Sequence, residues 1–590
     1  MTMRKTKIVA TLGPATNDVE TMKRLIKAGM NTARINFSHG SYESHAVTIN
    51  ALKSARKALD APVALMLDTK GPEIRIKSFA AGEVELKKGQ TFTITTDDIE
   101  GDENRVSVTY DELPNDVATG NRILLDDGLI ELRVTRISGN EIQCTVLNDG
   151  KLGSNKGVNL PDSNVSLPSM TEKDMEDIKF GIKHGFDFLA ASFVRTPKDV
   201  LEIRQVLEDN DGTHIQIIAK IENREGIDNL QSILEVADGI MVARGDMGVE
   251  IQPEEVPLIQ KEMIKKANVA GKPVITATQM LDSMINNPRP TRAEANDVAN
   301  AIFDGTDAIM LSGETAKGSY PVESVKMMDR IARRIEDSLD YARALWQRSS
   351  QNVVNVTNAI TFATCSIAAD LDASCIVTVT KTGFTGRMVA KYRPNCPILV
   401  VAANEVVWRR MSLVWGVQST IAKMVESDEE LFEVAGQCAM DAELAKNGDV
   451  IVIVAGVPVG VAGSTNLVKV QIVGDILAKG RGNIICKKPV VGKTAVIKPS
   501  EDAGRTFQEG DILVVAQTND SMMDYIRKAG AVVVGTDQNL DNTHAEIACR
   551  ALKKPLIICN ERVIDLIRTG ITVTVDCEAG FVYNGTLTER

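Results

Sequence analysis

A lysine and two acidic residues lie close together in the middle of the chain, at the ends of apolar runs. Lys220 and Glu222 are two residues apart, so their side chains would project to the same side of an extended strand. Asp246 follows the next apolar run. Two neighbouring carboxylates suit Mg2+ or Mn2+, and an adjacent lysine can stabilise a transferring phosphoryl group or a developing enolate. For any single pair, an ion-pair network with a purely structural role is the alternative.

Further polar residues end two apolar runs nearer the N-terminus. Arg34, Asn36 and Ser38 alternate with apolar residues, so they share one face of a strand. Asp68 and Thr69 end the next run. Together, the carboxylate, amide and hydroxyl oxygens could coordinate a monovalent cation or a second divalent cation.

Two arginines and a threonine could contact an anionic substrate. Arg34 and Arg75 can each bind a phosphate through two parallel N–H bonds, although an isolated arginine more often forms a surface salt bridge. Thr278 could relay a proton or donate a hydrogen bond, although a hydroxyl bonded to the backbone is the more common use. Polar residues after two other runs are interpreted as groups that support the site or position its loops: Ser192, Arg195, Ser312 and Glu314.

These residues need a fold that brings the ends of distant apolar runs together. Helix-like segments, with apolar residues at three- and four-residue spacing, lie between most of the runs. Strands that alternate with helices favour a parallel sheet, and eight such units favour a closed (β/α)8 barrel with its active site at the C-terminal ends of the strands. The eight runs are Lys7–Leu12, Thr32–Phe37, Val63–Leu67, Phe188–Phe193, Ile215–Lys220, Gly239–Ala243, Pro273–Thr278 and Ala308–Leu311.

At 590 residues the chain is long enough for several domains. We predict an α/β protein with a (β/α)8 TIM barrel over residues 1–71 and 168–346, an inserted all-β domain over 72–167, an α/β domain over 347–474 and an extra α/β domain over 475–590. The inserted domain is placed to act as a lid over the mouth of the barrel. Thr171 and Asp174 have nearly the spacing of a capping box where the barrel resumes.

Composition limits the partners and the compartment. The net charge of −12 argues against a nucleic-acid or anionic-membrane partner. Nine cysteines without a CxxC pair indicate reduced, mostly buried thiols. No apolar stretch reaches the ~18 residues of a membrane span, and the N-terminal apolar run is too short for a secretory signal. We therefore expect a cytoplasmic protein.

Six segments carry most of these polar residues, and in combination they are very specific. The segments are Asn31–Gly40 (NTARINFSHG), Leu67–Arg75 (LDTKGPEIR), Ile218–Ile227 (IAKIENREGI), Met241–Glu250 (MVARGDMGVE), Pro273–Asp282 (PVITATQMLD) and Met310–Glu314 (MLSGE). They resemble the signature blocks of the pyruvate kinase family almost letter for letter, and the resemblance extends to about residue 475. It implies that the chain transfers a phosphoryl group from phosphoenolpyruvate to ADP, giving pyruvate and ATP, as a homotetramer.

The same resemblance implies roles for individual residues. Lys220 would stabilise the phosphoryl group in flight, and Thr278 would serve the proton route to pyruvate. The implied substrate-binding residues are Arg34, Arg244, Gly245, Asp246 and Thr278, with backbone amides of the Arg244–Asp246 segment meeting the substrate carboxylate, and the implied nucleotide-binding residues are Asn36, His39, Arg75 and Lys156. Glu222 and Asp246 would hold Mg2+ or Mn2+, and K+ would bind at Asn36, Ser38, Asp68 and Thr69. A glutamate at the position of Glu73 accompanies potassium dependence in this family.

The unit at 347–474 resembles the family's regulatory domain. Its segment Thr378–Arg387 (TVTKTGFTGR) reads as a strand, a loop rich in hydroxyls and glycine, and the start of a helix. A sugar phosphate or nucleotide phosphate would suit that helix N-terminus, although an ordinary strand–helix turn is the alternative. The candidate residues for such a phosphorylated effector are Thr380, Lys381, Thr382, Gly383 and Thr385.

The tail from about residue 475 resembles an extra C-terminal domain of some bacterial members, related to the phosphohistidine domain of enzymes that use phosphoenolpyruvate. His544 lies where the phosphorylated histidine would be, but Gln538–Asp541 replace the usual glycine pair. We therefore expect a structural tail with an idle histidine. Gly492–Thr494 resembles the end of a phosphate-binding P-loop, but position 487 is lysine instead of the required glycine, so we interpret it as a turn.

Two other functions deserve comparison with this one. A non-catalytic barrel that senses phosphoenolpyruvate or nucleotides predicts loss of at least one key residue, whereas all four are present: Lys220, Glu222, Asp246 and Thr278. An aldolase-type barrel would use Lys220 as a Schiff base, which needs a depressed lysine pKa and no adjacent divalent metal. The two acidic residues argue against it, and borohydride trapping with substrate would separate the two enzymes.

Overall fold

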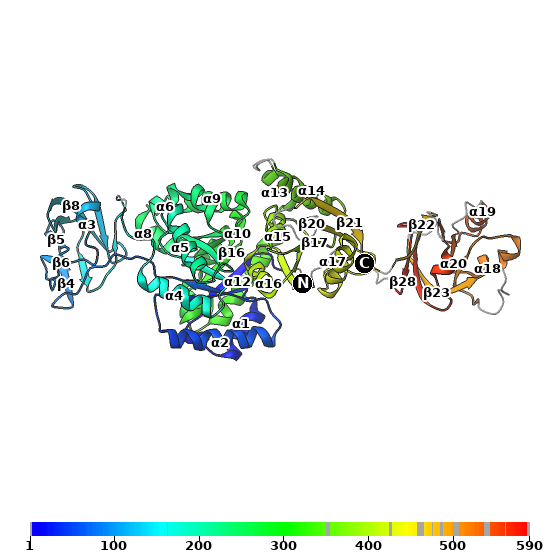
Figure 1. Cartoon of the computed structure of the whole chain (residues 1–590), viewed down its shortest axis with the longest axis horizontal. Coiled ribbons are helices and arrows are strands. Elements are labelled where there is room, and N and C mark those ends of the chain that lie inside the picture. Colours follow the sequence, from blue (N-terminus) through cyan, green and yellow to red (C-terminus); the bar gives the residue numbers. More distant parts are fainter. Residues whose placement is uncertain are drawn as a thin grey trace. The chain divides into compact units, whose positions relative to one another are not determined.

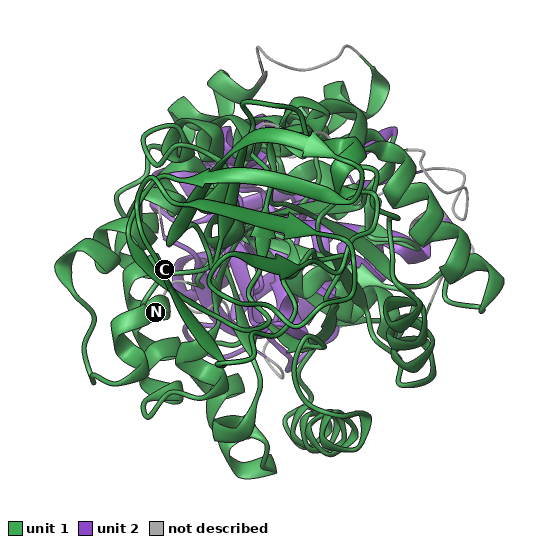
Figure 2. Cartoon of the chain, turned by 90° about the vertical axis from the view of Figure 1, so that its left-hand side faces the viewer, with its two compact units in different colours: residues 1–365, 379–424, 460–465 green, residues 366–378, 425–459, 466–590 purple. Residues whose placement is uncertain are grey.

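The computed structural model describes residues 3–161, 163, 165–349, 355–423, 427–456, 465–474, 476–483, 488–498, 507–535, 543–560 and 562–586. The chain divides into two compact units, which Figure 2 colours green and purple. The first unit holds residues 1–365, 379–424 and 460–465, and the second holds residues 366–378, 425–459 and 466–590. This division passes through the α/β domain expected at 347–474, so the domain boundaries remain a prediction.

Eight parallel strands close into the predicted barrel within the first unit, in the order β1-β16-β15-β14-β13-β12-β3-β2. Six of the eight predicted runs contain one of these strands in full, and β3 and β13 each extend one residue beyond theirs. Their bounds are β1 Lys7–Thr11, β2 Thr32–Asn36, β3 Ala64–Asp68, β12 Phe188–Ala191, β13 Gln216–Ile221, β14 Gly239–Ala243, β15 Val274–Ala277 and β16 Ala308–Leu311.

Alternation along each strand determines what fills the barrel and what lines its mouth. In β3, Ala64 and Met66 belong to the apolar cluster inside the barrel, while Leu65 and Leu67 pack outward with the surrounding helices. Since side chains alternate between the two faces of a strand, the next inward position is Asp68, at the C-terminal end. An apolar interior therefore lies directly beneath a polar layer.

Helices surround the barrel, several of them labelled in Figure 1. Their bounds are α1 Val19–Ala28, α2 Tyr42–Ala58, α4 Glu172–Lys183, α5 Pro197–Asp209, α6 Arg224–Asp228, α7 Leu230–Val236, α8 Arg244–Glu250, α9 Val256–Ala270, α10 Arg292–Asp304, α11 Gly313–Ala316, α12 Pro321–Glu336 and α13 Tyr341–Ser349. The helical segment that follows the last barrel strand is two helices: α12 ends at Glu336, and Asp340, which accepts a hydrogen bond from the Arg343 backbone N–H (2.9 Å), precedes the start of α13. In the described part of the chain, no helix is long and apolar enough to cross a membrane.

The inserted domain is built from two sheets, whose strands are mostly antiparallel, and one short helix. A six-stranded sheet has the order β11-β7-β8-β9-β5-β6, and β10 pairs with β4. Three of these strands, β6, β10 and β11, have only two to four residues. The bounds are β4 Glu83–Leu86, β5 Thr91–Thr95, β6 Arg105–Ser107, α3 Leu113–Asp116, β7 Arg122–Leu125, β8 Ile130–Ser138, β9 Glu141–Val146, β10 Gly150–Gly153 and β11 Val158–Asn159.

The remaining elements alternate strands and helices, as expected of the two later domains. Up to β21 they are α14 Val356–Asp370, β17 Cys375–Thr380, α15 Phe384–Ala390, β18 Ile398–Ala402, α16 Glu405–Arg410, β19 Val417–Ile421, α17 Asp428–Asp441, β20 Val450–Ala455 and β21 Leu467–Ile472. The tail forms a second closed barrel, β22-β26-β25-β24-β23-β27-β28. Its elements are β22 Ile476–Gly482, β23 Val490–Ile497, β24 Ile512–Val515, α18 Met523–Lys528, β25 Ala531–Gly535, α19 Thr543–Ala551, β26 Leu556–Cys559, α20 Val563–Leu566, β27 Thr572–Asp576 and β28 Phe581–Asn584.

Two expectations for smaller features have clear outcomes. Gly492–Thr494 lies within β23 and pairs with β27, so the sequence interpretation of a turn was wrong, and position 487 lies outside the described residues. Seven of the eight described cysteines are buried, and Cys396 is partly buried, in agreement with mostly buried thiols.

The predicted capping box forms where the barrel resumes after the inserted domain. The Thr171 hydroxyl accepts a hydrogen bond from the Asp174 N–H (3.1 Å), and Asp174 Oδ2 accepts one from the Thr171 N–H (2.9 Å). The other carboxylate oxygen of Asp174 accepts a hydrogen bond from the N–H of Gly71 (3.1 Å), beyond the end of β3. One buried side chain therefore holds the start of α4 and the exit from β3 together.

We predict that Asp174→Ala loosens this junction, because the buried N–H of Gly71 loses its acceptor. Backbone hydrogen exchange in the first turn of α4 and around Gly71 should accelerate about tenfold. Hydrogen–deuterium exchange with mass spectrometry measures this change. Glu176→Ala, an exposed position on the same helix, is the control and should exchange at the wild-type rate. Equal exchange in both variants would refute the role of Asp174.

Candidate active site

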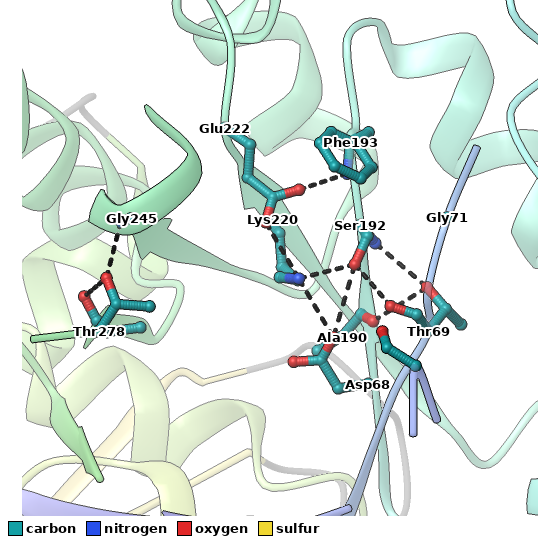
Figure 3. Close-up of polar contacts among 12 residues, drawn as sticks. Asp68, Thr69, Gly71, Ala190, Ser192, Phe193, Lys220, Glu222, Gly245 and Thr278 are labelled. Carbon is teal, nitrogen blue, oxygen red and sulfur yellow. Dashed lines mark hydrogen bonds and ion pairs between the residues drawn. The ribbon is translucent and has the colours of Figure 1, made fainter. Parts of the chain in front are cut away.

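The ammonium group of Lys220 is buried among three oxygens at the C-terminal end of the barrel (Figure 3). Lys220 Nζ lies 2.6 Å from Ser192 Oγ, 3.0 Å from Glu222 Oε1 and 3.2 Å from Asp68 Oδ1. Burial acts to lower the pKa of Lys220, but the charges of Asp68 and Glu222 outweigh it, so the pKa is raised. Lys220 is thus a fixed cation, which argues against the Schiff-base alternative.

Asp68 is held in its charged form by Arg34. Asp68 Oδ2 accepts a hydrogen bond from Arg34 Nε at 2.5 Å, and Arg34 Nη1 donates to Thr11 Oγ1 at 2.9 Å. Burial acts to raise the pKa of Asp68, but the nearby charges of Arg34 and Lys220 bring it below its ordinary value. Arg34 therefore uses two of its nitrogens to orient Asp68 and the end of β1.

The two carboxylate oxygens of Glu222 have different partners. Its Oε2 accepts a hydrogen bond from the Phe193 N–H (2.6 Å), whereas its buried Oε1 faces Lys220 Nζ but accepts no hydrogen bond. Burial raises the pKa of Glu222 to about 7; the charge of Asp246 adds to this shift, and Lys220 opposes it. A buried carboxylate with a raised pKa, whose Oε1 is paired with Lys220 alone, is a group that a further cation would stabilise.

Asp246 approaches the same cluster from α8. It is exposed in the first turn of that helix, and its charge shifts the pKa of both Lys220 and Glu222. Among the described residues, no three His, Cys, Asp or Glu side chains gather to hold a metal. A divalent cation here would thus have two protein carboxylates, with water and substrate oxygens as the other ligands.

Gly245 and Thr278 form a polar pair on the opposite side of the site (Figure 3). The Gly245 N–H donates to Thr278 Oγ1 (2.8 Å), which in turn donates to the carbonyl of Ala277 (2.7 Å). Thr278 has a φ of +66°, which a β-branched residue adopts only where its surroundings impose it. The hydroxyl is therefore precisely oriented by both backbone groups before any substrate binds.

The guanidinium group of Arg244 supports that pair. It donates to the carbonyls of Ala277 (3.1 Å) and Thr278 (2.6 Å) and forms an ion pair with Asp297 (2.7 Å). The side chain thus joins the start of α8 to the end of β15. Because its side chain is occupied by these contacts, the part of Arg244 that could meet a substrate is its backbone at the start of α8.

The four residues expected to bind K+ end neighbouring strands. Asn36 is aligned with Asp68 in the pairing of β2 with β3, and Asn36 Oδ1 accepts a hydrogen bond from the Ser38 N–H (3.1 Å). Thr69 Oγ1 accepts a hydrogen bond from the Ser192 N–H (3.2 Å). Amide, carboxylate and hydroxyl oxygens are thus close along two adjacent strand ends.

The expected nucleotide-binding side chains of the inserted domain, Arg75 and Lys156, are paired with acidic residues of the same domain. Arg75 forms a two-pronged ion pair with Glu73 (2.7 and 2.9 Å), and Lys156 pairs with Asp126 (2.9 Å). His39 is exposed on the loop after β2. A cavity of about 290 Å³ separates the inserted domain from the barrel, with lining residues that include Glu73, Gly157, Asn159, Phe193, Asn223 and Asp246.

Sequence reasoning underestimated two hydroxyl groups. Ser192 was expected to play only a supporting role, but its Oγ accepts the shortest hydrogen bond of Lys220 and donates to the Thr69 carbonyl (2.7 Å). Thr11, which binds Arg34, was not considered. The alternation of side chains along a strand could have revealed both residues. Ser192 lies two residues after the inward-facing Ala190, and Thr11 lies two residues after the inward-facing Val9. Arg195 does position a loop, since it donates to the carbonyls of Val165 and Leu167.

The candidate effector loop has the expected strand–loop–helix form, from β17 to α15. Thr380 Oγ1 accepts a hydrogen bond from the Gly383 N–H (3.1 Å), and Thr382 Oγ1 accepts one from the Phe384 N–H (3.4 Å). The Thr385 hydroxyl is buried and lies 3.0 Å from that of Thr465. The threonine hydroxyls therefore shape the loop, and Lys381 is exposed at its tip.

His544 of the tail lies at the start of α19. Its Nδ1 is 3.0 Å from Thr518 Oγ1, and its Nε2 is 3.2 Å from Asp520 Oδ1. Gln538–Asp541, on which the expectation of an idle histidine rested, lie outside the described residues. That expectation remains a prediction.

Three parts of the chain match models of known protein families. Residues 3–325 match the barrel domain of pyruvate kinase, residues 358–471 match its alpha/beta domain, and residues 507–580 match the mobile domain of PEP-utilising enzymes.

Full-length relatives agree with these matches. The chain is 52% identical over 584 residues to the pyruvate kinase of Geobacillus stearothermophilus and 50% identical over 585 residues to that of Bacillus licheniformis, covering 99% of both chains in each comparison. A crystal structure of a pyruvate kinase from Cryptosporidium parvum superposes with a TM-score of 0.76 at 43% identity, covering 80% of this chain and 96% of that one. The chain belongs to the pyruvate kinase family.

Proposed function

We propose that the Lys220 cluster is where the phosphoryl group of phosphoenolpyruvate passes to ADP, giving pyruvate and ATP. The observation that carries this assignment is a permanently charged ammonium group, held by two carboxylates at the mouth of a barrel. A phosphoryl group in transfer spreads negative charge over its oxygens, and a preorganised cation stabilises that charge. Lys220 therefore acts as the electrostatic catalyst.

The substrate carboxylate would lie beside α8. The N–H groups around Gly245 are at the start of this helix, where backbone donors favour an anion, and Thr278 adds a hydroxyl. In the second half of the reaction the enolate carbon needs a proton. The oriented hydroxyl of Thr278 is our candidate for the route by which that proton arrives.

Glu222 and Asp246 fit a divalent metal, because Glu222 Oε1 is buried without a hydrogen bond and both groups offer hard oxygen ligands. Bound Mg2+ or Mn2+ would supply charge to neutralise the phosphoryl oxygens. The oxygens of Asn36, Ser38, Asp68 and Thr69 fit K+ by the same chemistry. Arg34, beside Asp68, would add a cation near the phosphate.

The inserted domain would close over the site as a lid. Asn36, His39, Arg75 and Lys156 are proposed to bind ADP, and closure would bring the last two toward the barrel while excluding water. The salt bridges of Arg75 with Glu73 and of Lys156 with Asp126 would exchange for phosphate contacts.

Regulation and assembly follow the family pattern in this proposal. A phosphorylated small molecule would bind the loop of Thr380, Lys381, Thr382, Gly383 and Thr385, and the protein would act as a cytoplasmic homotetramer. A titration of activity with sugar phosphates and nucleoside monophosphates would identify the effector.

Lys220→Ala should reduce phosphoryl transfer at least about 10³-fold, because the charge on the moving phosphoryl group loses its preorganised cation. Phosphoenolpyruvate and Mn2+ should still bind. A coupled pyruvate assay and equilibrium binding measure the two properties. The control is Lys265→Ala, an exposed lysine of α9. Wild-type turnover in the Lys220 variant would remove the assignment.

Metal affinity should depend on pH through Glu222. Its pKa is raised to about 7, so the carboxyl is protonated below that pH and must lose its proton to bind a cation. Mn2+ affinity should therefore rise about tenfold per pH unit below 7 and level off above it. Electron paramagnetic resonance titrations measure this dependence, over a pH range from roughly 5.5 to roughly 8.5, which is about 1.5 pH units on either side of the pKa of Glu222. In Glu222→Gln the affinity should be low and the dependence absent, and a flat wild-type profile would contradict the prediction.

Catalysis should require K+. Replacing K+ by Na+ at constant ionic strength should lower kcat/KM at least about tenfold. The reason is that Na+ is smaller than K+ and cannot contact the oxygens of Asn36, Ser38, Asp68 and Thr69 all at once. The same coupled assay measures it, with Mg2+ kept saturating. Full activity in a potassium-free sodium buffer would refute the monovalent site.

A further inference from the structure

Helix α8 has seven residues, and its first turn is fixed to the barrel. There, Arg244 donates hydrogen bonds to the carbonyls of Ala277 and Thr278. The Gly245 N–H donates to Thr278, and Asp246 extends from the same turn. The groups proposed to meet substrate and metal therefore move only if α8 moves.

The last turn of α8 contacts the inserted domain at two places. Glu250 Oε1 accepts a hydrogen bond from Asn159 Nδ2 (3.3 Å), and the backbone N–H of Leu160 also stabilises the Glu250 charge. Asn159 is the last residue of β11. The second contact joins Gly128 of the inserted domain to Val249 of α8. If Gly128 carried a Cβ atom, that atom would be in van der Waals contact with Val249 Cγ1, at 3.7 Å. Both contacts come from loops or strand ends of the inserted domain.

The position of Glu250 is unfavourable for a helix by itself. The C-terminal end of a helix carries partial negative charge, so a carboxylate in the last turn is destabilising unless other groups compensate. Burial raises the pKa of Glu250, and the donors at Asn159 and Leu160 oppose that shift. The described donors that compensate this charge thus belong to the inserted domain rather than to the barrel.

We propose that Glu250 is a positioning residue that couples the inserted domain to the substrate-binding turn of α8. The helix is about 10 Å long and one hydrogen-bonded unit, so a displacement of its last turn is transmitted to Gly245 and Asp246. By linkage, substrate bound at the first turn favours the arrangement in which Asn159 and Leu160 hold Glu250. This inference rests on the proposed function of the Gly245 and Asp246 turn.

The test compares Glu250→Ala, Glu250→Gln and Asn159→Ala in the full-length enzyme. Asn159→Ala removes the partner on the inserted domain and leaves α8 intact, so it serves if Glu250→Ala fails to fold. Glu254→Ala is the matched control, an exposed glutamate just beyond the helix. Hydrogen–deuterium exchange is measured in α8 and β11, with and without phosphoenolpyruvate and Mg2+, alongside kcat and KM for ADP.

In the wild type and the control, the ligands should slow exchange in both α8 and β11. In Glu250→Ala and Asn159→Ala the slowing should persist in α8 but be lost in β11, and KM for ADP should rise about tenfold. Glu250→Gln should recover part of the coupling, because its amide oxygen still accepts the bond from Asn159.

Wild-type protection of β11 in the two alanine variants would overturn the proposal. So would faster exchange of α8 in the absence of ligands, since that would mark a merely structural residue. These readouts require ligand binding but no turnover. Failure of the proposed function would instead appear as a wild-type enzyme that makes no pyruvate.

Discussion

A buried ammonium group is stable only where anionic oxygens surround it, and in this barrel Asp68 and Glu222 supply them around Lys220. The same contacts determine the state of each partner. Arg34 and Lys220 bring the pKa of Asp68 below its ordinary value, whereas burial raises the pKa of Glu222 to about 7 even though Lys220 opposes that shift. Asp68 is therefore shared between two buried cations, Lys220 and Arg34, whereas the Oε1 atom of Glu222 is paired with Lys220 alone.

The barrel makes this charge cluster possible by alternation. Inward positions of β3, β12 and β13 are apolar in the interior and become polar at the C-terminal ends, where Asp68, Ser192 and Lys220 meet. The interior beneath excludes water, so electrostatic interactions at the top of the barrel are strong. On the other side, β14 and β15 end in Ala243 and Ala277, which leaves room for α8 and the strained Thr278 to form the second half of the site.

Much of this could be predicted from the sequence, because the signals are local. Each strand of the barrel appears as a short apolar run, and the two-residue spacing of Lys220 and Glu222 already places them on one side. The capping box of Thr171 and Asp174 was also visible. An error arose where the pattern is ambiguous, because Gly492–Thr494 looked like a turn but pairs as a strand.

By itself, the sequence determined the type of fold, the family and the residues that carry charge, since alternation, apolar runs and motif spacing are properties of neighbouring positions. Only the tertiary structure decided how those charges are divided. Arg34 is occupied by Asp68 and Thr11, Arg244 supports Thr278, and Arg75 and Lys156 are paired within the inserted domain. Apart from Glu73 and Arg75, these partners lie tens of residues apart in the chain, and no local spacing encodes which of them meet.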